Sequence, residues 1–122
     1  FGPAKWTQEA LEVALAESPL LEVCGSDTWR VALRKLGADV VAMDAHNSEG
    51  AEAQWKEHSQ RTLLLIYPSS GPLAASCLQK FQGSKLIYVG EPRGGVNADD
   101  AFFDSVSRDW TLTATAALDR LP

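Results

Sequence analysis

The residues best suited to chemistry lie in one short segment, 22–29, which reads Glu-Val-Cys-Gly-Ser-Asp-Thr-Trp. An apolar run precedes this segment and a helical spacing of apolar residues follows it, so the segment is predicted to link a strand to a helix. In an open parallel sheet, ligands bind outside the carboxyl ends of the strands, where the strand order reverses. Residues 22–29 are therefore the first candidate for a ligand-binding loop.

The glycine content of this loop limits the ligands that it can bind. Gly25 is its one glycine, whereas dinucleotide-binding loops follow the pattern G-x-G-x-x-G, because glycines let backbone N–H groups approach the pyrophosphate. The pattern G-x-x-x-x-G-K-[ST] of nucleoside-triphosphate sites is absent as well. NAD, FAD and nucleoside triphosphates are therefore poorly supported as ligands.

The spacing of apolar residues predicts the elements that position the loop. Continuous apolar runs ended by Gly, Pro or Asp predict strands, and segments with a helical period predict helices. We expect Ser18-Pro19 and Gly37 to end the first two helices, Pro72 to lie in the first turn of the fourth, and Asn97 to cap the fifth. The predicted strands are 20–24, 38–43, 62–67, 85–89 and 110–115, and the predicted helices are about 5–17, 29–36, 49–57, 73–81 and 97–107.

These elements define a fold class. Apolar strands that do not alternate with polar residues indicate a sheet covered on both faces, and the alternation of strands and helices makes that sheet mostly parallel. The prediction is an α/β fold: a three-layer α/β/α Rossmann-like domain. With no internal repeat and no linker rich in Pro, Gly or Ser, a single domain is predicted over residues 1–122.

Composition excludes several functions. The 122 residues are 45% hydrophobic and 22% charged, which is typical of a globular protein with one core. A formal net charge of −5 argues against general binding to nucleic acid or to an anionic membrane. The longest apolar runs fall far short of the roughly 20 residues that cross a bilayer, so no membrane span is expected.

Cysteines and the first residue bear on the compartment. Cys24 and Cys77 lie in apolar surroundings without a C-x-x-C spacing, so two buried free thiols and a reducing compartment, cytoplasm or organelle interior, are predicted. The chain begins at Phe1 rather than Met, which fits a processed precursor, for example one that has lost a leader, and equally fits a segment of a longer protein. An organellar complex is compatible with that start.

Other polar residues have simpler interpretations. His46 and His58 do not share a helical face, so surface histidines are favoured over metal ligands, and no metal site is predicted. Ser69 and Ser70 lack the G-x-S-x-G pattern of a hydrolase and suit helix capping. The four tryptophans are spread through the chain and are expected to be core or partner anchors rather than a stacking platform for bases.

Several segments together resemble one family. These are Leu21-Glu22-Val23 before the loop, Trp29 after it, and the run Gly37-Ala38-Asp39-Val40-Val41-Ala42-Met43-Asp44. They resemble the first motifs of class I S-adenosylmethionine-dependent methyltransferases. Residues 61–68 resemble the strand of that family's fourth motif, and residues 86–91 the strand after it. Residues 94–95, 99–103 and 108–110 resemble the tail of a methyltransferase-like branch.

The resemblance implies a candidate cofactor site. Glu22 would orient the methionine end of S-adenosylmethionine through the glycine loop, and Asp44 would accept hydrogen bonds from the ribose hydroxyls. Tyr67 would stand where family members position the accepting atom of the substrate. Methyl transfer depends mainly on positioning, so no catalytic residue is assigned. The implied cofactor-binding residues are Glu22, Gly25, Ser26, Asp27, Asp44 and Tyr67.

The sequence also departs from the family. Cys24, Ser26 and Thr28 place side chains where the family's loop reads G-x-G-x-G. Between Asp44 and Thr62 the chain is abbreviated, with only Glu49 or Glu52 available as an acidic third motif, and it stops before the family's C-terminal hairpin. The predicted fold is thus a methyltransferase-like domain shortened at the C-terminus. An end strand without its neighbour is either exposed or covered by a partner.

These observations lead to two functional hypotheses. The first is a methyltransferase-like domain that has lost catalysis and serves as a structural or binding subunit of a larger protein assembly. The second is an active S-adenosylmethionine-dependent methyltransferase, and an α/β domain for another nucleotide is a weaker third. Simpler alternatives stay open: Glu22 as a paired structural carboxylate, Asp44 as a turn residue, and Asp27 or Thr28 as a helix cap.

Overall fold

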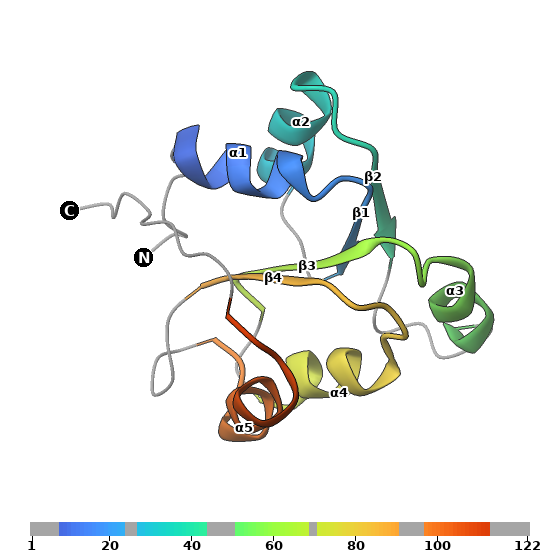
Figure 1. Cartoon of the computed structure of the whole chain (residues 1–122), viewed down its shortest axis with the longest axis vertical. Coiled ribbons are helices and arrows are strands. Elements are labelled where there is room, and N and C mark those ends of the chain that lie inside the picture. Colours follow the sequence, from blue (N-terminus) through green and yellow to red (C-terminus); the bar gives the residue numbers. More distant parts are fainter. Residues whose placement is uncertain (1–7, 24–26, 44–50, 69–70, 91–96, 113–122) are drawn as a thin grey trace.

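The computed structural model describes residues 8–23, 27–43, 51–68, 71–90 and 97–112 (Figure 1). Strands and helices alternate along these residues. In chain order the elements are α1 (Gln8–Ala16), β1 (Leu20–Val23), α2 (Asp27–Lys35), β2 (Val40–Met43), α3 (Ala51–Glu57), β3 (Thr62–Ile66), α4 (Leu73–Lys80), β4 (Leu86–Val89) and α5 (Asp100–Asp109).

The four strands form one parallel sheet in the order β2-β1-β3-β4. Leu20 of β1 lies beside Val40 of β2 on one side and Thr62 of β3 on the other, so β1 is an inner strand. The chain moves from β1 to β2 and then crosses back to β3. The strand order therefore reverses at β1, where the sequence placed the candidate loop.

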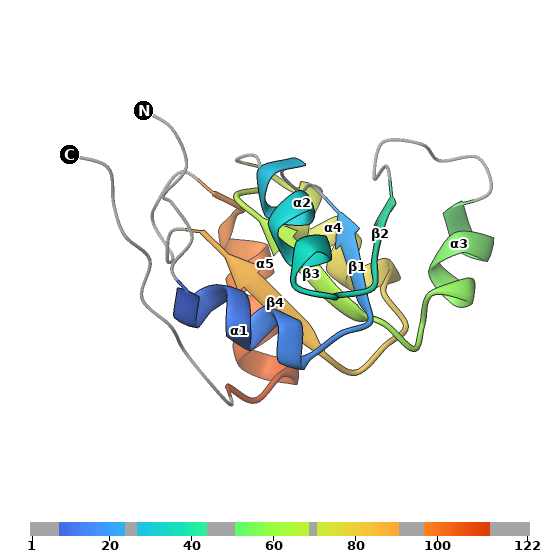
Figure 2. The ribbon, with the colours of Figure 1, turned by 90° about the horizontal axis from the view of Figure 1, so that it is seen from above.

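Helices cover both faces of this sheet. Alternate residues of β1 and β3 point to opposite sides: Leu21 and Leu63 pack with α3, α4 and α5, whereas Leu20 and Leu64 pack with α1 and α2. Figure 1 shows these two layers above and below the strands, and Figure 2 shows α3 beside β2, at the side of the sheet away from β4. The structure is an α/β fold consistent with the predicted Rossmann-like class.

The structure confirms one predicted helix end and corrects two others. Gly37 has a φ of 98° and ends α2, as predicted, because its N–H bonds Arg34 O in a left-handed turn. Asn97 does not cap α5. Asp99 does, accepting a hydrogen bond from Phe102 N–H at 3.0 Å. Pro72 is the residue before α4, not one inside its first turn.

The predicted fifth strand does not begin where it was expected. Residues 110–112 are not in a strand, and residues 113–115 lie outside the described residues. Trp110 instead stacks on Phe81, with ring centroids 6.4 Å apart and planes 16° apart. Trp55 of α3 meets the same ring edge-on, with 6.5 Å between the centroids, so the three aromatic rings form one cluster in the layer of α3, α4 and α5.

The core predictions hold within the described residues. Cys77 is buried and is not part of a disulfide, and Trp29 and Trp55 are each only 2% exposed. Cys24 and Trp6 lie outside the described residues. No helix in the described part of the chain is long and apolar enough to cross a membrane.

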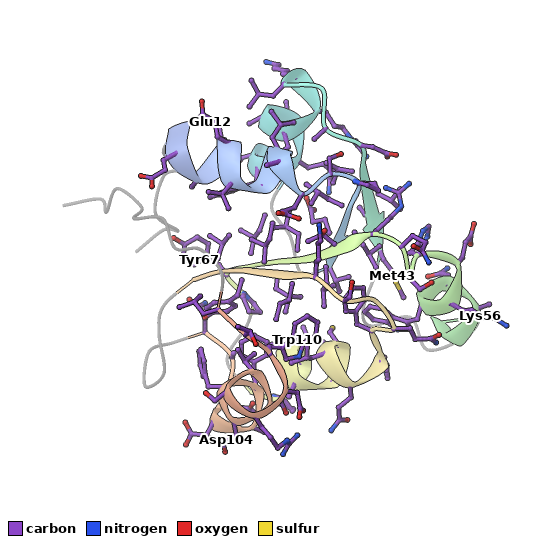
Figure 3. The ribbon with its side chains drawn as sticks, in the orientation of Figure 1. Glu12, Met43, Lys56, Tyr67, Asp104 and Trp110 are labelled. Atoms are coloured by element: carbon purple, nitrogen blue, oxygen red, sulfur yellow. The ribbon has the colours of Figure 1, made fainter. Side chains whose placement is uncertain are left out.

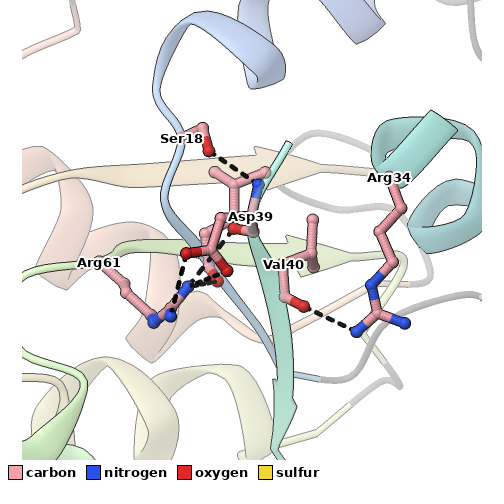
Figure 4. Close-up of polar contacts among 6 residues, drawn as sticks. Ser18, Arg34, Asp39, Val40 and Arg61 are labelled. Carbon is pink, nitrogen blue, oxygen red and sulfur yellow. Dashed lines mark hydrogen bonds and ion pairs between the residues drawn. The ribbon is translucent and has the colours of Figure 1, made fainter. Parts of the chain in front are cut away.

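Arg61 ties the amino ends of three strands together (Figure 4). Its Nη1 donates to Leu20 O at 3.2 Å and to Asp39 Oδ1 at 3.1 Å, and its Nη2 donates to Asp39 Oδ2 at 3.4 Å. Ser18 Oγ accepts from Asp39 N–H at 3.0 Å. One guanidinium thus joins β1, β2 and β3 at the edge opposite the candidate loop.

Replacing Gly83 by alanine is expected to lower the free energy of unfolding by about 1–3 kcal/mol. A Cβ at this position would lie 2.4 Å from the Phe81 ring and 2.7 Å from Ser59 O, so both the ring and the backbone would have to move. Urea denaturation measures the change. The neighbouring exposed Ser84→Ala is the control, within about 0.5 kcal/mol of the original protein. Equal effects of the two changes would contradict this packing.

Candidate functional site

The carboxyl ends of all four strands meet at one edge of the sheet, because the strands are parallel. The candidate loop begins there, after Val23 of β1. Of the residues that the resemblance assigns to a cofactor, Gly25, Ser26 and Asp44 lie outside the described residues. Asp27 is the first residue of α2. The side chains that the structure places are those of Glu22 and Tyr67.

Glu22 is the third residue of β1 and is 3% exposed. In the strand register it lies between Ala42 of β2 and Leu64 of β3. The alternation of the strand places it on the same side as Leu20, facing α1 and α2 rather than the edge of the sheet. A carboxylate buried in this layer is costly unless it is paired.

Arg30 of α2 provides the pairing charge. Its Nη1 donates to Glu22 Oε1 at 2.8 Å, and its side chain is 22% exposed. The contact is possible because α2 packs on the same face of the sheet as Leu20, which is also the face that Glu22 points to. The two residues form a partly buried ion pair, the structural alternative that the sequence left open for Glu22.

Arg30 does not stand out in the sequence as a candidate functional residue. Its position could have indicated the ion pair. Trp29 and Leu33 are buried on the side of α2 that faces the sheet, and residue 30 lies beside them on the helix surface. An arginine there can reach the one carboxylate of the preceding strand.

Tyr67 follows β3 at the same edge of the sheet and has a φ of 45°, in the left-handed region that non-glycine residues rarely adopt. Its N–H donates to Val89 O at 2.6 Å. Strand alternation would send its ring toward α4 and α5, but the ring packs in the layer of α1 and α2, and Figure 3 shows Tyr67 at this end of the sheet. The left-handed backbone therefore turns the side chain to the other face.

Asn97 is a second residue at this edge whose role differs from the predicted one. Instead of capping α5, its Nδ2 donates to Pro68 O at 3.0 Å, and Asn97 is only 7% exposed. Pro68 is buried as well. A Cβ at Gly90 would lie 3.0 Å from Asn97 Oδ1 and 2.8 Å from Tyr88 Oη, which explains a glycine there. These contacts pack the segments after β3 and β4 against the start of α5.

Two side chains that the resemblance assigns to S-adenosylmethionine are among those described. Glu22 Oε1 accepts a hydrogen bond from Arg30 on the face of the sheet covered by α1 and α2. Tyr67 follows β3 at the carboxyl end of the sheet. Among the described residues, no group of three or more His, Cys, Asp or Glu side chains could hold a metal ion.

Comparison of the chain with protein-family models, curated proteins and solved structures found no match.

Proposed function

We propose that the chain is a methyltransferase-like Rossmann domain that has lost catalysis and serves as a structural or binding subunit of a larger protein assembly. The supporting observation is the ion pair between Glu22 and Arg30, with 2.8 Å between Oε1 and Nη1. It gives a structural role to the residue that the family resemblance assigns to the cofactor.

The energetics of this pair favour the structural role. If Glu22 orients the loop after β1, its carboxylate has to turn away from Arg30, and losing one partner of a partly buried ion pair costs up to roughly 3–5 kcal/mol. A cofactor would have to supply that free energy in addition to the ordinary cost of association. The side-chain-bearing loop at Cys24, Ser26 and Thr28 adds to this difficulty, because backbone approach normally needs glycine there.

The rest of the sheet is well built, which supports retention of the domain for something other than catalysis. Leu21, Leu63 and Leu64 are each 0% exposed in the two inner strands. A chain that preserves such packing while committing its candidate cofactor residue to an ion pair suits a scaffold. Its partners would be proteins, since the net charge of −5 does not favour nucleic acid.

Calorimetric titration with S-adenosylmethionine and S-adenosylhomocysteine tests the cofactor half of this proposal. We expect no heat of binding at micromolar ligand from a chain whose circular dichroism and urea transition show that it is folded. Asp44→Ala is the matched control, because it removes the carboxylate that the resemblance assigns to the ribose. Micromolar binding that Asp44→Ala abolishes would overturn the proposal.

The second candidate is an active S-adenosylmethionine-dependent methyltransferase, which one observation favours. Tyr67 keeps a strained backbone at the sheet edge, and strain of that kind is often retained at functional sites. This candidate predicts cofactor binding in the same titration. The two proposals therefore separate on a single experiment.

A further inference from the structure

We propose that Asn97 is a positioning residue that holds Tyr67 in its left-handed conformation through the carbonyl of Pro68. The inference goes beyond the proposed function, because it does not depend on whether a cofactor binds. It concerns how the carboxyl end of the sheet fixes Tyr67, whose backbone has a positive φ. Its evidence is one hydrogen bond between segments 29 residues apart.

The dipeptide 67–68 is held at both of its ends. Ahead of it, Tyr67 N–H donates to Val89 O at 2.6 Å. Behind it, Pro68 O accepts from Asn97 Nδ2 at 3.0 Å. A non-glycine residue keeps a left-handed φ only where its surroundings fix it, and these two bonds fix the peptide units on either side of the Tyr67–Pro68 pair.

Burial makes the Asn97 bond matter. Asn97 is 7% exposed and Pro68 is fully buried, so water does not easily replace the amide as a donor to the Pro68 carbonyl. Removing the donor would leave a buried acceptor unsatisfied, which is more costly than the net value of an ordinary hydrogen bond. The turn would then relax toward a conformation that exposes the carbonyl, and Tyr67 would leave the left-handed region.

Asn97 is itself anchored by α5. Ala98, the next residue, also has a positive φ of 61°, and Asp99 then caps the helix. Phe102 of the first helical turn is 1% exposed and fixes α5 against the sheet. Contacts therefore run from the core through α5 to Asn97, and from Asn97 to the turn that carries Tyr67.

The experiment reads Tyr67 directly. The chain has two tyrosines, so labelling tyrosine alone with ¹⁵N gives two amide signals, which Tyr88→Phe assigns. In Asn97→Ala we expect the Tyr67 signal to move. We also expect the hydrogen-exchange rate of the Tyr67 amide to rise at least about tenfold. The slowest-exchanging amides of a uniformly labelled sample are the reference, because they report global unfolding. Asn97→Ser, which also lacks the amide, is the milder variant should alanine prevent folding.

Asp99→Ala is the matched control. It removes the cap of the same helix two residues away, so it lowers stability, but it leaves the Asn97 amide on Pro68. We expect the Tyr67 signal to stay in place in this variant. A folded Asn97 variant with an unchanged Tyr67 signal and exchange rate would overturn the inference, as would an equal displacement in Asp99→Ala.

Discussion

Replacing Arg30 by methionine is expected to lower the free energy of unfolding by about 3 kcal/mol. The change preserves most of the side chain's length but leaves the Glu22 carboxylate, 3% exposed, without the guanidinium that binds it at 2.8 Å. Urea denaturation at a constant m-value measures the loss. A loss below about 1 kcal/mol, the value of an exposed pair, would contradict the structural role of this contact.

The double variant Glu22→Leu with Arg30→Met separates the pair from the packing around it. Replacing both charges by apolar groups removes the need for pairing, and such replacements are often neutral or stabilising. We expect the double variant to regain most of the stability that Arg30→Met alone loses. If the stability loss of the double variant instead equals the sum of the losses of Glu22→Leu and Arg30→Met measured singly, the two residues do not act as a pair.

Phe102→Ala is expected to cost about 3–5 kcal/mol, the largest effect of any single change proposed. The ring is 1% exposed, and its centroid lies 5.2 Å from those of Tyr88 and Phe103. Removing it leaves a cavity between α5 and the sheet. Thermal and urea unfolding both measure the loss.

Phe103→Ala is the control for Phe102→Ala because it removes the same side chain from the next position on α5. Phe103 is half-buried and meets Tyr88 at 5.7 Å, so less apolar surface leaves water when it packs. We expect its cost to be less than half that of Phe102→Ala. Equal costs would contradict the orientation of α5 on the sheet.

The inner strands could be predicted from sequence because their signal is local. The runs that become β1 and β3 are apolar apart from Glu22 and Thr62, do not alternate with polar residues, and every residue in both strands is buried. Helix limits were predictable where one residue type decides them, as at Gly37. The predicted fifth strand contains apolar residues too, but Trp110 stacks on the Phe81 ring, a tertiary contact that no local sequence pattern reveals.

The candidate site was harder to predict, because tertiary contacts decide it. Asn97 and Asp99 are both good helix caps by type. The difference is that Asn97 is buried against Pro68, which leaves the cap to Asp99. The left-handed backbone of Tyr67 has the same origin, since bonds from two distant segments impose it. The location of Glu22 was predicted, but its partner Arg30 was not.

The most direct test of the proposal that this sheet edge does not bind S-adenosylmethionine is an NMR titration of the ¹⁵N-labelled chain with S-adenosylhomocysteine. The signals to follow are the amides of Val23, Tyr67 and Gly90, which follow or end three neighbouring strands. We expect no saturable change in these signals. Saturable shifts at these amides, lost in Asp44→Ala, would contradict the proposal and identify a working cofactor site.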